Sequence, residues 1–239
     1  MIYPNVEHRR LLRLFAGVLD YPTVELAEKV RQCEALVASL VPEAVPLVRA
    51  FRTFAERTPL GLLEEIYTGI FDLNPMCCPY VGYHLFGDHY QRSAFLVALQ
   101  ERYRVQGFAV SQAEVADRLS VVLRFVAESK NEDESRELID EGLLPALERM
   151  TKRAEAGKED PAEWHGRPGP STPHLEGHSE GEILGAGFLL EITEGASTSS
   201  QTWYAYQCAL DAVQLVLKAL EPPHAAEQIT GSLGGRDDD

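Results

Sequence analysis

Apolar residues recur along most of the chain at intervals of three and four positions, which is the spacing of one face of an α-helix. The first such stretch carries Leu11, Phe15 and Val18, and it stops at Tyr21-Pro22, where proline disfavours further helix. The same periodicity predicts helices at about 11–19, 26–40, 43–57, 62–71, 89–106, 115–126, 132–153 and 203–220.

Turn and cap residues separate these stretches. Gly107 is placed to take the left-handed conformation that ends a helix. Ser111 and Glu114 have the spacing of a capping box, in which the two side chains bond the first turn reciprocally, so a helix is expected to begin there. We find no hairpin signal outside 157–201 and no repeat at a solenoid period. The sequence therefore predicts an all-α fold, a single helical bundle domain of about eight helices.

The periodicity fails between residues 157 and 201, where Gly, Pro, Ser, Thr, His and Glu dominate. We expect a long, irregular and flexible insertion there, just before the last helix. The predicted organisation is a helical core at 1–156, the insertion at 157–201, a closing helix of the core at 202–222 and a disordered tail at 223–239.

One predicted connection is unusually apolar. Residues 74–88 are rich in proline, glycine and aromatic side chains, among them Tyr80, Tyr83 and Phe86. Connections exposed to solvent are normally polar. We therefore expect another segment to pack on this loop.

The net charge of −15 and the pI near 4.9 argue against nucleic acid as a partner, because phosphate binding depends on clustered Lys and Arg. Residues 128–194 hold 17 acidic and 7 basic side chains, so most of the charge lies there. A solvated surface explains this run, and an acidic face that docks a basic peptide is the alternative.

The four cysteines, which include the adjacent pair Cys77 and Cys78, lack the spacing of a disulfide framework and indicate a reducing compartment. Arg9 and Arg10 ahead of an apolar run resemble a twin-arginine export signal, but charged residues interrupt that run. No stretch approaches the ~20 apolar residues of a membrane span. We expect a cytoplasmic protein without membrane insertion.

The sequence has no phosphate-binding glycine loop and no nucleophile elbow, so we expect no enzyme and no cofactor. Cys77, Cys78, His84, Asp88 and His89 are possible metal ligands within thirteen residues. Adjacent cysteines seldom converge on one tetrahedral zinc ion, so we expect no metal site, and a small metal-binding helper protein is the alternative.

Three segments resemble the NarJ/TorD-like family of molybdoenzyme chaperones, which includes the nitrate reductase delta subunit and chaperones of dimethyl-sulfoxide-reductase-type enzymes. They are YTGIFDLNPMCCPYVGYHLFGDHYQR at Tyr67–Arg92, LQERYRVQGF at Leu99–Phe108 and EVADRLSVVLRFVAES at Glu114–Ser129. In the third segment Arg118 stands where the resemblance predicts histidine, and it replaces a group that titrates near neutrality with a fixed cation.

The resemblance implies an all-helical protein that binds the N-terminal or signal peptide of a molybdopterin-containing subunit. That subunit would be held in the cytoplasm until its cofactor is inserted, before export or membrane attachment. Aromatic side chains offer broad contact area, and carboxylates can meet basic residues of the client. The candidate contacts with the client peptide are Tyr80, Tyr83, His84, Phe86, Asp88, Arg92, Glu114, Asp117, Arg118 and Leu119.

Packing in the core is the competing interpretation for the aromatic residues of this set. At the level of function, a structural subunit of a finished oxidoreductase is a further alternative, because such a subunit would persist in the active complex. We expect a monomer or a weak dimer that binds the catalytic subunit of a molybdenum oxidoreductase.

Overall fold

The computed structural model describes residues 5–73, 77–111, 114–156 and 198–220. Helices dominate this part of the chain, and its one β pairing is an isolated bridge between Tyr80 and Arg118. The predicted all-α fold is confirmed. The helices are α1 (Val6–Val18), α2 (Leu26–Leu40), α3 (Val45–Arg57), α4 (Leu60–Thr68), α5 (Val81–Phe86), α6 (Tyr90–Gln106), α7 (Leu119–Glu128), α8 (Glu132–Glu137), α9 (Leu144–Ala156) and α10 (Thr198–Ala219).

Three short helical segments of other types join these helices. A 3-10 turn, η1 (Pro42–Ala44), precedes α3, and a π-helical turn, η2 (Gly69–Leu73), continues α4. A second π-helical segment, η3 (Leu138–Leu143), lies between α8 and α9, so that one helical run extends from 132 to 156. Among the described residues no helix is long and apolar enough to cross a membrane.

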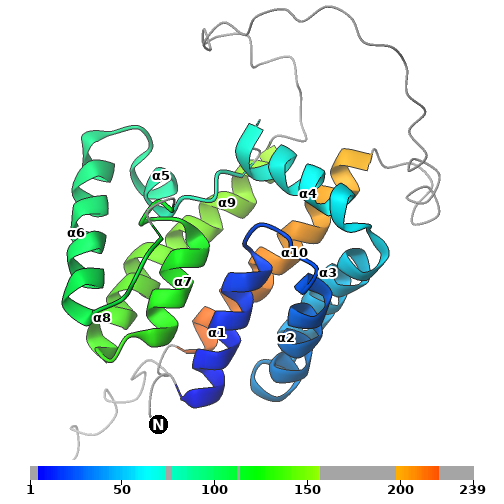
Figure 1. Ribbon diagram of the computed structural model, residues 1–239, viewed down its shortest axis with the longest axis horizontal. Coiled ribbons are helices and arrows are strands. Elements are labelled where there is room, and N and C mark those ends of the chain that lie inside the picture. The colour runs from blue at the N-terminus through cyan, green and yellow to red at the C-terminus, as the bar shows by residue number, and fades with distance from the viewer. Residues whose placement is uncertain (1–4, 74–76, 112–113, 157–197, 221–239) are drawn as a thin grey trace, which may run out of the picture.

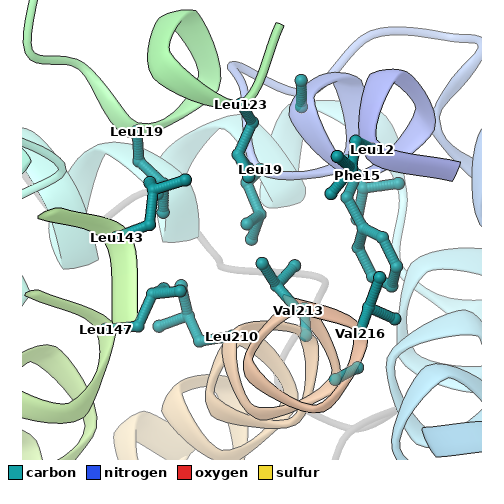
Figure 2. Packing of buried hydrophobic residues seen from close by; sticks show 14 of the residues in the cluster. Leu12, Phe15, Leu19, Leu119, Leu123, Leu143, Leu147, Leu210, Val213 and Val216 are labelled. Atoms are coloured by element: carbon teal, nitrogen blue, oxygen red, sulfur yellow. The ribbon is translucent and has the colours of Figure 1, made fainter. Parts of the chain in front are cut away.

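The last helix, α10, lies at the centre of the bundle and packs against α1, α3 and α9, while α1 also contacts α2 and α7 (Figure 1). Figure 2 shows leucine and valine side chains from these helices pointing toward one another, with Leu12 and Phe15 of α1 above Val213 and Val216 of α10. Because α10 is buried around most of its circumference, its apolar residues do not form a single stripe.

An aromatic cluster forms one end of this core. The ring of Tyr206 in α10 lies 5.1 Å from Phe51, 5.3 Å from Phe71 and 6.1 Å from Tyr67, mostly edge to face. These are favourable geometries for aromatic pairs. The cluster joins α3, α4, η2 and α10 into one core.

The structure differs from the predicted helices in two places. The backbone from Glu114 to Arg118 is not helical, and α7 begins only at Leu119, so the prediction of a helix starting at the capping box was wrong. The Glu114 carboxylate binds Arg124 at 2.9 Å. The second difference is α5, a short helix inside the stretch expected to be a loop.

The domain boundaries stay predictions. Of the expected insertion, residues 157–197 lie outside the described residues, and α10 already begins at Thr198. The expected tail at 223–239 also lies outside them.

Candidate functional site

The short helix α5 is held by the segment that leads into α7. The backbone N–H of Val81 donates to the carbonyl oxygen of Asp117 at 2.8 Å, and that of Leu119 donates to the carbonyl oxygen of Pro79 at 2.8 Å. These reciprocal bonds flank the bridge described above. They fix the start of α5 against a segment almost forty positions later in the sequence.

The side chain of Asp117 is fully buried beneath α5. Its Oδ2 accepts hydrogen bonds from the backbone N–H of Gly82 at 3.2 Å and from Nε of Arg92 at 3.1 Å. A Cβ atom on Gly82 would lie 2.8 Å from Oδ2 and 2.9 Å from the ring of Phe95. Only glycine therefore lets the backbone of α5 approach the carboxylate this closely.

The guanidinium of Arg92 joins this carboxylate to two aromatic rings. Its Cζ lies 5.3 Å from the centre of the Tyr80 ring and 6.0 Å from that of Tyr83, within the range of cation–π attraction. The structure thus brings together four of the candidate residues, Tyr80, Tyr83, Arg92 and Asp117. Their contacts with one another anchor α5 to α6 and to the segment before α7.

The end of α5 is held by two further side chains. Nε2 of His84 lies 2.7 Å from the carbonyl oxygen of Cys78, so this nitrogen donates the hydrogen bond. Nη1 of Arg149, in α9, donates to the carbonyl oxygens of His84 at 2.6 Å and Leu85 at 2.9 Å. Arg149 satisfies carbonyl groups that the end of a helix leaves without intrahelical partners.

A hollow of about 150 Å³ opens between α5, α6 and η3, and we call it the α5–α6 groove. Phe86 is the candidate residue that lines it, and the ring of Phe86 packs 5.7 Å from that of Phe95. Its lining is mainly apolar with charged residues among it: Leu85, Phe86, Phe95, Ala98, Leu99, Arg102, Glu137, Leu138, Glu141 and Gly142.

Gly142 is buried, yet apart from its neighbours in the same helical run no atom lies within 4 Å of the position that its Cβ would occupy. That space belongs to the groove, which the π-helical segment η3 borders. Arg102 donates to Glu137 at 2.6 Å from Nη2, while its Nη1 is buried and has no hydrogen-bond partner. The groove therefore combines an apolar lining with polar groups that a bound segment could satisfy.

A second hollow, of about 380 Å³, lies between α5 and α9, and we call it the basic hollow. The described residues that line it are Tyr83, His84, Arg149 and Lys152. Residues 83–86 of the apolar stretch thus border two hollows, although Asp117 beneath α5 is buried.

Three other candidate residues do not join this cluster. Glu114 pairs with Arg124 of α7, and Leu119 is buried in the core. Asp88 is exposed in the turn between α5 and α6, next to Gly87, which has a φ of 63°.

No three His, Cys, Asp or Glu side chains of the described residues gather where they could hold one metal ion. Within the suggested ligand set, Cys77 is buried in the core, whereas Asp88 and His89 are exposed.

The chain is 27% identical over 140 residues to the nitrate reductase molybdenum cofactor assembly chaperone NarJ of Bacillus subtilis (strain 168). The match covers 58% of this chain and 74% of that protein. This match supports the resemblance of the chain to the NarJ/TorD-like family of molybdoenzyme assembly chaperones. No protein-family model matches it.

Among solved structures, a redox enzyme maturation protein from Archaeoglobus fulgidus matches with a TM-score of 0.40 and 22% sequence identity. The match covers 62% of this chain and 90% of that one.

Arg118, which replaces the histidine predicted from the family resemblance, lines neither hollow and contacts Tyr67 of α4 and Asp20 just after α1. Its Nη2 donates to the hydroxyl of Tyr67 at 2.8 Å and lies 3.2 Å from Oδ1 of Asp20. In this chain, position 118 therefore ties the segment before α7 to the N-terminal helices.

Replacing Tyr67 with phenylalanine should make folding less sensitive to alkaline pH. Burial raises the pKa of Tyr67 to about 12, against the opposing effect of Arg118, whereas an unfolded tyrosine ionises near 10. The unfolded chain thus loses this proton first, and stability falls between about pH 10 and 12. Wild type should lose about 1.4 kcal/mol per pH unit more than Tyr67→Phe there. Urea unfolding at stepped pH measures this, and equal slopes would contradict it.

Sequence reasoning did not single out Gly82, Arg149 or the η3 segment. The only signal for Gly82 was a glycine inside an aromatic stretch. Arg149 and Gly142 lie on a helix whose sequence shows an ordinary amphipathic pattern, so nothing local distinguishes them.

Proposed function

We propose that this chain is a cytoplasmic chaperone that binds the N-terminal or signal region of a molybdopterin-containing oxidoreductase subunit. It would assist cofactor insertion and assembly before the subunit is exported or attached to the membrane. The similarity to NarJ supports the class of function, and the α5–α6 groove is the observation that supports binding of a polypeptide. The chain itself would have no catalytic role.

The lining of the groove suits an amphipathic helix of the client. An apolar side chain from such a helix could enter between Phe86, Phe95 and Leu138, as in other helix-in-groove complexes. The exposed carboxylates of Glu137 and Glu141 at the rim could meet a neighbouring Lys or Arg of the client. The pair between Arg102 and Glu137 neutralises one of the two carboxylates, and Glu141 leaves the rim with a net negative charge.

Co-purification with the catalytic molybdenum subunits of the host organism tests this proposal. The full-length chain should retain a subunit made without its cofactor and should release it once the cofactor is inserted. It should fail to retain the same subunit without its N-terminal segment.

Two results would count against the proposal. Retention of the truncated subunit would place recognition outside the N-terminal region. Equal retention of the active, cofactor-loaded enzyme would favour a structural subunit. Elemental analysis of the purified chain tests the remaining alternative, a metal-binding helper protein, because such a protein would contain a stoichiometric amount of bound metal.

A further inference from the structure

The α5–α6 groove and the basic hollow share one wall. Leu85 and Phe86 of α5 face the groove, and the two preceding residues of the same helix line the basic hollow. Figure 1 shows α5 between α6 and α9, and α5 contacts both helices as well as η3. A segment bound across α5 would therefore meet both hollows.

The same helical run also borders both hollows. Gly142 of η3 lines the groove, and Arg149 of α9 lines the basic hollow. The two residues are seven positions apart, which is two helical turns or about 10 Å along the axis. Residues two turns apart lie on the same side of a helix. One client helix of ordinary length could span this distance.

The two hollows differ in charge. At the groove, Glu137 and Glu141 outnumber Arg102, which also lies 3.5 Å from Glu134. At the basic hollow, Arg149 and Lys152 are the charged residues among the described lining. Arg149 is held in place by its two bonds to the end of α5, and its exposed side chain keeps further N–H donors.

This difference matters because the whole chain carries a net charge of −15. Overall charge alone would favour a uniformly basic client. A client with cations along its full length would place some of them beside Arg149 and Lys152, and such like-charge contacts cost binding energy. The basic hollow thus selects against the client that the overall charge would attract.

We infer that the client segment is a dipolar amphipathic helix that crosses α5. One apolar side chain enters the α5–α6 groove with a Lys or Arg beside Glu137 and Glu141. About two turns away, an Asp or Glu of the client lies against Arg149 and Lys152. This inference rests on the proposed function, and it adds the charge pattern and the position of the client.

Three synthetic peptides with one shared apolar stripe test the inference by fluorescence anisotropy with the full-length chain. The first carries Lys at one end and Glu at the other, the second Lys at both ends, and the third Glu at both ends. The dipolar peptide should bind at least about 10-fold more tightly than either of the others, a difference of about 1.4 kcal/mol. High salt should reduce this preference.

Charge reversal in the chain should change the preference. Lys152 is exposed, and its ammonium group pairs with Glu148 one turn earlier, so Lys152→Glu should fold normally. The variant should shift the binding preference toward the all-Lys peptide. Glu141→Lys should shift it toward the all-Glu peptide. Arg104→Glu, an exposed change of equal charge on α6, is the matched control and should leave the preference unchanged.

The outcomes separate this inference from the proposed function. If the all-Lys peptide binds wild type as tightly as the dipolar one, the charge pattern is wrong and the proposed function stands. If Arg104→Glu shifts the preference as much as Lys152→Glu, overall charge explains the binding and the inference is overturned. If no peptide binds while the co-purification succeeds, the groove is not the site, and the inference falls alone.

Discussion

Replacing Asp117 with alanine is expected to lower the free energy of unfolding by about 3 kcal/mol, because one buried carboxylate holds both α5 and Arg92. The substitution leaves the N–H of Gly82 without its partner and separates Arg92 from its counter-charge. Arg92 is 24% exposed and can regain water, so the cost stays below that of a fully buried ion pair.

Urea unfolding followed by circular dichroism measures this loss. Asp88→Ala is the matched control, since it removes an exposed carboxylate from the turn at the end of α5, and its effect should stay within about 0.5 kcal/mol. If both variants unfold at the same urea concentration as wild type, Asp117 does not hold α5 in solution. The Asp117→Ala substitution should also weaken client binding, because it loosens α5, which lines both hollows.

Most of the bundle is predictable from the sequence because its helices bury one regular apolar face. The stripe of Leu11, Phe15 and Val18 appears as predicted in α1, where all three side chains are buried. Periodic burial is a local property of the sequence, and it needs no knowledge of the partner helix.

The start of α7 was mispredicted because a tertiary contact replaces a local signal. Ser111 and Glu114 have the spacing of a capping box, yet Glu114 pairs with Arg124, and the segment before Leu119 pairs with residues 79–81. These long-range bonds satisfy the backbone groups that a first helical turn would otherwise use. No window of the sequence around residue 114 contains that information.

The helix α5 was missed for a related reason. Its six residues are too few to be stable alone, and glycines lie within and after it. Asp117 fixes its beginning and Arg149 its end, from segments about 35 and 65 positions away. Both hollows were unpredictable as well, because they depend on where α5 lies between α6 and α9.

Filling the α5–α6 groove should abolish most client binding without unfolding the chain. Gly142→Leu places four carbons in the open space beside η3, where an apolar side chain of the client would insert. We expect at least about a thirty-fold rise in the Kd of the client's N-terminal peptide, which corresponds to about 2 kcal/mol, the size of a main anchor contact. The unfolding free energy should change by no more than about 1 kcal/mol. The higher helix propensity of leucine relative to glycine offsets the cost of minor crowding.

Gly69→Leu supplies the matched control for this variant. Gly69 is also part of a π-helical turn, and outside its own helical turn no atom lies within 4 Å of its Cβ position, but it lies in η2 and lines neither hollow. Its substitution should leave the peptide Kd unchanged. If Gly142→Leu and Gly69→Leu bind the peptide equally well, the client docks elsewhere. If Gly142→Ala alone already weakens binding, the client backbone itself contacts η3, because a single methyl group leaves most of the groove open.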